Sequence, residues 1–147
     1  PIAAKVYVID DAELDRVKNN YPVMWKDKNA TPKLCFVGCP HLSYDQLVEW
    51  TENVFESLKK NGRSKVSIPT VFTAAPAVVE KFNATPNAAK LKATGVVLSY
   101  ICPLMYMNNP LAGKMPVITN SNKLRTYTTS RYYTSAEILD IITKEAK

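Results

Sequence analysis

Three short polar segments carry the residue types that could do chemistry. Gly38-Cys39-Pro40-His41 places a thiol beside the only histidine of the sequence, and Tyr100-Ile101-Cys102-Pro103 supplies a second thiol followed by proline. Asn120-Ser121-Asn122-Lys123 supplies a hydroxyl and an ammonium group. Two thiolates on neighbouring loops suit a soft metal or an iron–sulfur cluster. Backbone amides with a hydroxyl and a cation suit an anion.

The cysteines also have an ordinary structural interpretation. Free cysteine is among the most buried residue types, and the sequence has no Cys-x-x-Cys pair to indicate a local zinc or ferredoxin motif. Alternation along a strand places Cys35, Val37 and Cys39 on one face, with Cys35 and Cys39 about 13 Å apart. Cys35 is therefore predicted to be a core residue. For Cys39 and Cys102, ligation and structural burial both stay open.

The other polar side chains have two interpretations as well. A lone histidine before a helix usually makes ordinary hydrogen bonds, but beside Cys39 the imidazole of His41 could orient a ligand or donate to a substrate. Ser121 and Lys123 could form an anion pocket, or they could belong to a solvated loop.

Alternating strands and helices must position these segments. Strands are expected at Val6–Ile9, Lys33–Gly38, Lys65–Phe72, Gly95–Tyr100, Met115–Thr119 and, at an edge, Arg131–Tyr133. Helices are expected after capping boxes at Asp10/Glu13, Ser43/Gln46 and Thr134/Glu137, and from Pro76 and Pro86, with loops at 19–32 and Met105–Lys114. This alternation predicts an α/β fold of three layers, a mostly parallel sheet flanked by helices. The carboxyl ends of parallel strands share one edge, where the three polar segments could converge.

Composition limits the classes of function. The 147 residues are 46% hydrophobic and 22% charged, which excludes wholesale disorder and predicts one domain. No apolar run approaches the length of a membrane span, and the basic residues behind the net charge of +6 are scattered. We therefore expect an anionic small-molecule partner, no nucleic acid and no membrane. Three cysteines without a leader sequence predict a cytoplasmic protein. Pro1 in place of Met suggests a domain of a longer polypeptide.

The order of the motifs resembles the catalytic (large) subunit of the aconitase X family. The resemblance is carried by Phe36–Ser43 with the amphipathic helix after it, by Cys102-Pro103, by Thr119–Lys123 and by Tyr127. It covers nearly the whole chain. It implies that residues 1–147 are a single α/β domain of aconitase-like fold, in the C-terminal part of a longer catalytic subunit.

The resemblance also implies an activity. Members are iron-dependent hydro-lyases, which dehydrate small hydroxy acids such as cis-3-hydroxy-L-proline or mevalonate 5-phosphate. An iron–sulfur cluster or iron is held by three cysteines, of which Cys39 and Cys102 would be two and the third would lie outside this chain. The base is a serine of a small swivelling subunit or domain, so Ser121 is not assigned that role. His41, Ser121 and Lys123 would bind substrate.

The resemblance to this family also implies which partners the chain would have. The remainder of the large subunit and the swivelling subunit or domain would complete the enzyme, so the isolated chain is expected to be inactive. Relatives carry Asp-Thr-Cys where this chain has Tyr100-Ile101-Cys102, which changes contacts near the substrate.

One alternative function is that of a non-catalytic α/β ligand-binding or interaction domain with structural cysteines in separate apolar cores. Another is a phosphate-ligand or nucleic-acid binder, which requires a continuous positive face.

Overall fold

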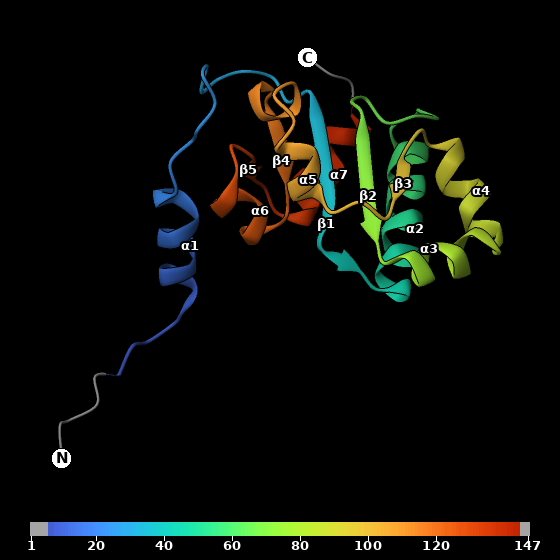
Figure 1. Cartoon of the computed structure of the whole chain (residues 1–147), viewed down its shortest axis with the longest axis horizontal. Helices are drawn as coiled ribbons and strands as arrows, with labels where there is room; N and C mark the ends of the chain where they lie inside the picture. The colour runs from blue at the N-terminus through green and yellow to red at the C-terminus, as the bar shows by residue number, and fades with distance from the viewer. Residues whose placement is uncertain (1–5, 145–147) are drawn as a thin grey trace.

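A five-stranded parallel sheet forms the centre of the computed structural model, which describes residues 6–144 (Figure 1). The strands are β1 (Leu34–Leu42), β2 (Thr70–Ala74), β3 (Val97–Ser99), β4 (Val117–Thr119) and β5 (Arg131–Tyr132). They lie in the order β3-β2-β1-β4-β5, and every pair is parallel. The predicted α/β class is thereby confirmed, and β5 is the predicted edge strand.

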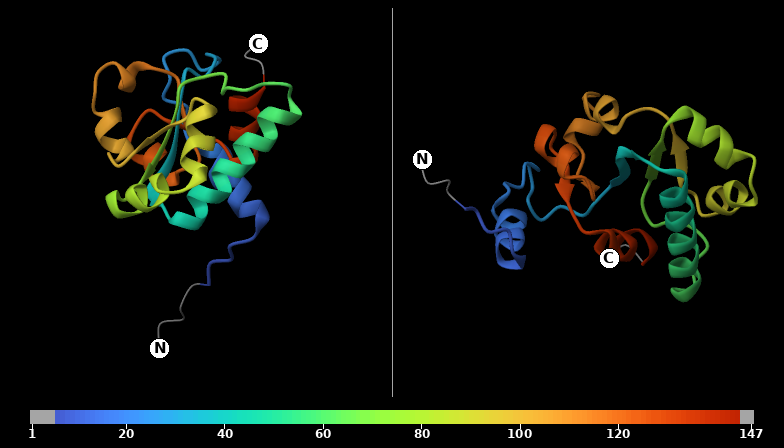
Figure 2. Two further views of the ribbon diagram at one scale, coloured as in Figure 1. Left: turned by 90° about the vertical axis from the view of Figure 1, so that its right-hand side faces the viewer. Right: turned by 90° about the horizontal axis from the view of Figure 1, so that it is seen from below.

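Helices cover both faces of the sheet and make the three predicted layers (Figure 2). The larger apolar core joins one face to α2 (Tyr44–Lys60), α3 (Pro76–Asn83), α4 (Pro86–Ala93) and α7 (Ser135–Thr143). A smaller apolar cluster joins the other face to α5 (Pro103–Met107) and α6 (Asn122–Tyr127). Within the described residues, no helix is both long and apolar enough to cross a membrane.

Two of the predicted capping boxes fix where the helices on the larger core begin. The Ser43 hydroxyl accepts from the Gln46 N–H at 3.2 Å, and the Gln46 side chain accepts from the Ser43 N–H at 2.9 Å. Thr134 and Glu137 make the same reciprocal pair at the start of α7. The helix α2 ends as predicted before Gly62, whose φ of +66° suits glycine. Sequence and structure therefore agree on the helices that follow β1 and β5.

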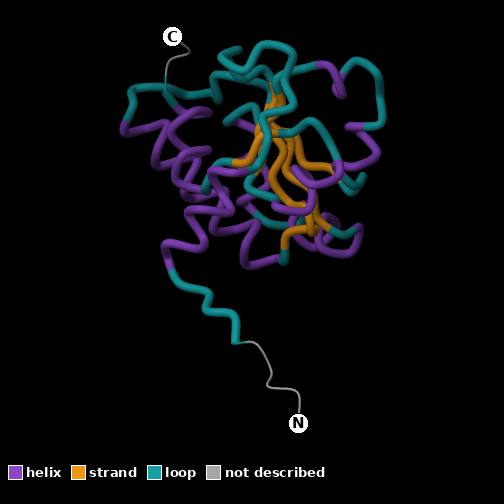
Figure 3. Tube along the Cα trace, turned by 90° about the vertical axis from the view of Figure 1, so that its left-hand side faces the viewer, coloured by secondary structure: helices purple, strands orange, loops and turns teal. Residues whose placement is uncertain are grey.

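The predicted strand at Val6–Ile9 is wrong. Val6 is 87% exposed and Ile9 is 71% exposed, and residues 6–10 belong to no strand or helix. This segment leads away from the sheet (Figure 3), so its alternating residues have no strand edge to pair with. The helix predicted after it is present as α1 (Asp11–Asn20), capped by Asp10, although none of its described side chains is buried.

Two other predicted boundaries differ from the structure. The strand expected at Lys65–Phe72 starts only at Thr70, because the N–H groups of Val66 and Ser67 donate to carbonyls outside the sheet. The loop expected at Met105–Lys114 contains the end of α5 and a 3₁₀ turn at Ala112–Lys114. Because α5 is only five residues long, it is stabilised by packing rather than by intrinsic helix propensity.

Candidate active site at the carboxyl ends of the strands

Gly38 gives the end of β1 an irregular path. Its φ is +110°, and a Cβ at this position would lie 2.3 Å from the Thr73 carbonyl oxygen of β2. The pairing register between β1 and β2 shifts between Val37 and Leu42, and the Cys39–Pro40 peptide bond is cis. Only glycine fits this close approach of two backbones. The Gly-Cys-Pro-His segment therefore leaves the regular alternation of the strand.

This irregularity changes the face on which Cys39 lies. Cys35 and Val37 point into the larger core, whereas Cys39 lies with Phe36 in the smaller cluster on the opposite face. The prediction that Cys35, Val37 and Cys39 share one face is wrong, because the positive φ of Gly38 and the register shift interrupt the period of two. Cys39 is 8% exposed.

Cys35 is a core residue, as predicted. It is fully buried between the sheet and the helices of the larger core. Burial raises the pKa of the Cys35 thiol, so this group stays protonated at neutral pH and is a poor ligand or nucleophile. The three cysteines of the chain are free.

The second cysteine of the candidate site, Cys102, is the N-cap residue of α5, and α5 packs on the apolar cluster that contains Cys39. Cys102 is half-buried at the N-cap position of α5. After β3 the chain crosses the sheet to reach α5, which lies against β1 (Figure 1). Met107 of α5 shares the apolar cluster of Cys39, and Tyr106 stacks on Phe36 with ring centroids 5.4 Å apart. The apolar cluster thus contains Cys39 and residues of α5, the helix for which Cys102 is the N-cap.

Ser121 follows β4, the neighbour of β1, and acts as the N-cap of α6. Its hydroxyl oxygen accepts from the Leu124 N–H at 2.9 Å, and its own N–H donates to the Thr119 hydroxyl at 3.2 Å. Ser121 is 4% exposed, whereas Lys123 is exposed on the first turn of α6. Leu124 packs in the cluster of Cys39, so this cap holds α6 beside that cluster.

His41 lines a separate pocket of about 350 Å³ at the end of β1. The exposed imidazole shares this pocket with Cys39 and with Asn120, whose amide donates to the Ser135 hydroxyl at 3.2 Å. Ser121 and Lys123 are not among its lining residues. The structure therefore brings His41 to Cys39, but it does not bring the three predicted substrate-binding residues into one pocket.

Polar residues of α2 complete this pocket, and the sequence analysis missed them. Gln46, Glu49 and Asn53 line it from one side of the helix, beside Trp50. Their spacing of three and four residues was a usable signal, because such positions lie on one helical face.

No group of three His, Cys, Asp or Glu side chains within residues 6–144 is arranged to hold a metal ion. Among these residues, Cys39 and Cys102 are the donors whose softness suits iron–sulfur chemistry and whose positions adjoin the sheet end.

The structure is a three-layer α/β domain with a parallel sheet, in which Cys39 lies at the end of β1 and Cys102 begins α5, the helix that packs on the same apolar cluster. Residues 32–143 match the aconitase X third domain, and the chain therefore belongs to the aconitase X family. The resemblance drawn from the Gly-Cys-Pro-His, Cys-Pro and Asn-Ser-Asn-Lys segments is confirmed at the level of the family. This family is one of aconitase-type hydro-lyases.

A solved structure shares the fold. The holo-form of aconitase X from Thermococcus kodakaraensis superposes with a TM-score of 0.69 at 21% sequence identity. The match covers 99% of this chain and 36% of that chain, so this chain spans little more than a third of the other's length. A search of curated proteins finds no match.

Proposed function

We propose that this chain is the C-terminal part of the catalytic subunit of an aconitase-type dehydratase. The observation that carries the proposal is that Cys39 packs in the same cluster as α5, the helix that Cys102 begins. Membership of the aconitase X family supports the reaction class. The reaction breaks a C–H bond and a neighbouring C–OH bond, forms a double bond and releases water.

This chain supplies two of the three cysteine ligands that the proposed iron–sulfur centre needs. Cys39 and Cys102 would hold it, and a third cysteine would come from outside this chain. When bound, an iron with an open coordination position would polarise the substrate hydroxyl as a leaving group. The apolar cluster around Cys39 lowers the local dielectric constant, which strengthens thiolate–metal bonding relative to competition from water.

The substrate class we propose is a small hydroxy acid, such as cis-3-hydroxy-L-proline or mevalonate 5-phosphate. Lys123 is exposed and forms no ion pair within residues 6–144, so it can pair with an anionic group of a substrate at this end of the sheet. The Ser121 oxygen accepts from the Leu124 N–H, so its hydroxyl proton can still be donated to the same group. His41 would contact substrate from the neighbouring pocket.

The remaining parts of the enzyme would come from the rest of the large subunit and from a swivelling subunit or domain, which would bring the base. We keep the cytoplasmic location as part of this proposal, since thiolate ligands need a reducing compartment. No nucleic-acid or membrane partner is part of it.

One observation favours the alternative, a non-catalytic α/β ligand-binding or interaction domain. Cys39 is almost fully buried among apolar side chains, as a structural cysteine would be. The two proposals differ in whether Cys39 and Cys102 are needed for turnover or only for packing.

The test is a dehydration assay of the complete catalytic subunit together with its swivelling partner. Each candidate hydroxy acid is supplied anaerobically, and formation of the dehydrated product is followed by NMR. The proposal predicts turnover that Cys39→Ala and Cys102→Ala each abolish, whereas Lys60→Gln on the far end of α2 retains it. Unchanged turnover in both cysteine variants, or no turnover of any hydroxy acid by an iron-loaded enzyme, would contradict it.

A further inference from the structure

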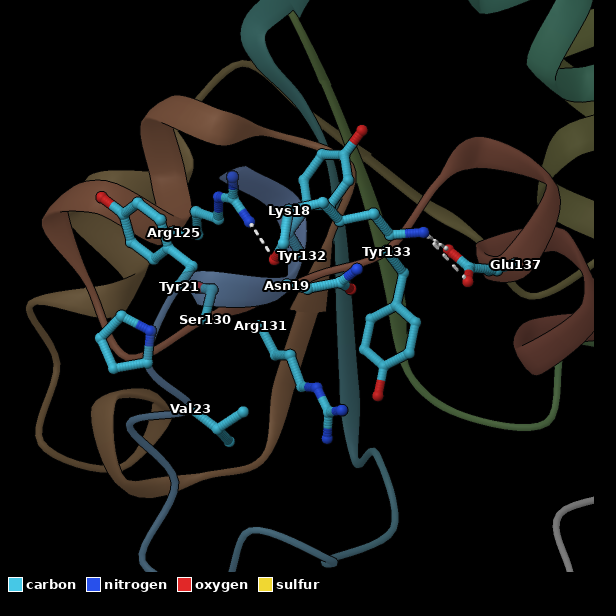
Figure 4. A pocket seen from close by; sticks show the side chains of 11 residues that line it. Lys18, Asn19, Tyr21, Val23, Arg125, Ser130, Arg131, Tyr132, Tyr133 and Glu137 are labelled. Carbon is cyan, nitrogen blue, oxygen red and sulfur yellow. Dashed lines mark hydrogen bonds and ion pairs between the residues drawn. The ribbon is translucent and has the colours of Figure 1, made fainter. Parts of the chain in front are cut away.

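A buried arginine that has no acidic partner among residues 6–144 lies at the opposite edge of the molecule from β3. Arg125 of α6 is 7% exposed, and its guanidinium lies between the rings of Tyr21 and Tyr132 at 4.2 and 4.9 Å from their centroids (Figure 4). Its hydrogen bond in the described chain runs from Nη1 to the Lys18 carbonyl at 3.4 Å. The Nε atom is buried and has no partner among the described residues.

This side chain lines a pocket of about 250 Å³ beside β5. Arg131 lines it too, with its guanidinium near the rings of Trp25 and Tyr133. Lys18 and Glu137 also face the pocket, but they pair with each other at 3.4 Å. No ion pair joins Arg125 or Arg131 to a carboxylate within residues 6–144. The pocket therefore carries two guanidinium groups that form no ion pair with a carboxylate of the described chain.

We propose that this pocket binds a small oxyanion, of the carboxylate or phosphate class. A buried cation is unfavourable without a counter-charge, and the guanidinium of Arg125 is held by stacking rather than by an acid. A guanidinium offers parallel N–H donors that match two oxygens of such an anion, and the pocket is lined by two guanidinium groups, those of Arg125 and Arg131. Ser130 is buried and also lines the pocket, but its hydroxyl is hydrogen-bonded to the Thr128 hydroxyl at 2.8 Å.

The site is distinct from the proposed active site. Its lining residues come from the end of α1 and the segment after it, from α6, from β5 and its flanking residues, and from the start of α7, and none of them lines the pocket of His41. A bound anion would join the Lys18–Val23 segment to β5. It would thus stabilise the attachment of this segment to the sheet.

The experiment is a titration of the 147-residue chain with inorganic phosphate and, separately, with sodium acetate, each against sodium chloride at equal ionic strength. The Nε–H signals of the arginines are followed by ¹H–¹⁵N NMR. We expect saturable shifts of the Arg125 and Arg131 signals, with affinity reduced about 10- to 100-fold in Arg131→Gln. The charge-matched control Lys60→Gln should bind as the unmodified chain does.

A second variant separates binding from folding. Arg125→Lys keeps the charge but loses the planar donors, and we expect it to remain folded, by its amide spectrum, while its affinity falls at least tenfold. Saturation by phosphate alone assigns a phosphate group, and saturation by acetate assigns a carboxylate. Shifts that grow linearly and equally with phosphate, acetate and chloride, or an Arg131→Gln affinity equal to that of Lys60→Gln, would overturn the proposal.

Discussion

The Thr73 hydroxyl donates a 2.6 Å hydrogen bond to the carbonyl of Gly38, from β2 to the end of β1. Both residues are buried, and Gly38 immediately precedes Cys39. The bond lies in the stretch where the register between the two strands shifts. It therefore helps to fix the path that turns Cys39 away from the larger core.

Removal of that hydroxyl should destabilise the chain. Thr73→Val keeps the shape but leaves the Gly38 carbonyl without this donor, which we expect to cost about 1–3 kcal/mol of unfolding free energy. Urea unfolding measures the loss. The control Thr31→Val, at an exposed threonine of the loop before β1, should change the free energy by less than about 0.5 kcal/mol. Equal losses in the two variants would contradict the role of the Thr73 bond.

A methyl group at Gly38 should be more damaging than one at Gly62. Both glycines have positive φ, but a Cβ at Gly38 meets the Thr73 backbone, whereas a Cβ at Gly62 has nothing within 4 Å. We expect Gly38→Ala to cost about 2–4 kcal/mol and Gly62→Ala about 1 kcal/mol. Thermal and urea unfolding of the two variants make the comparison. A Gly38→Ala variant as stable as Gly62→Ala would show that the ends of β1 and β2 can separate freely.

The three thiols should differ in their rates of alkylation. Cys102 is half-buried, Cys39 is almost buried, and Cys35 is fully buried with a raised pKa. Because the thiolate is the reactive form, iodoacetamide should modify Cys102 first, Cys39 more slowly and Cys35 only on unfolding. Mass spectrometry of timed samples measures the order, and all three should react alike in denaturant. Early modification of Cys35 in the native chain would refute this arrangement.

Ionisation of Glu137 should make the unfolding free energy depend on pH in the acid range. The backbone N–H of Thr134, followed by its hydroxyl and by Lys18, holds the pKa of Glu137 below its ordinary value. The unfolded chain then takes up this proton first as the pH falls. The stabilisation is therefore complete above the ordinary pKa of about 4.5 and is lost as the pH falls from there through the lower folded value.

The measurement is the unfolding free energy as a function of pH for Glu137→Gln. We expect this variant to be less stable than the unmodified chain near pH 7 and to lose less stability on acidification. Glu80→Gln, at an exposed carboxylate of α3, is the matched control. Parallel pH profiles for Glu137→Gln and the unmodified chain would contradict the prediction.

Local signals in the sequence predict the elements that local chemistry specifies. The Ser43/Gln46 and Thr134/Glu137 boxes locate α2 and α7, since each box is completed within one turn of backbone. The alternation of strands and helices was sufficient to predict a parallel sheet. The α/β class can be assigned from this alternation without knowing the order of the strands in the sheet.

The predictions that were wrong or incomplete concern features that depend on contacts between residues far apart in the sequence. Val6–Ile9 alternates like a strand, but pairing depends on an available edge, which the segment does not meet. The face of Cys39 depends on a close approach between Gly38 and Thr73, residues far apart in the sequence. The pocket around His41 is lined by residues of α2 and α7 and by Asn120, which follows β4, so these residues could not be identified before the sheet order was known.

We propose that Cys39 and Cys102 ligate one iron–sulfur centre. The most direct test is anaerobic reconstitution of the complete catalytic subunit with iron and sulfide, followed by absorbance and bound-iron analysis. We predict a thiolate-to-iron absorption band that is lost in Cys39→Ala and in Cys102→Ala and retained in Cys35→Ala, with all three variants folded by circular dichroism. A band of full intensity in the Cys39 and Cys102 variants, or its absence from the unmodified subunit, would contradict the claim.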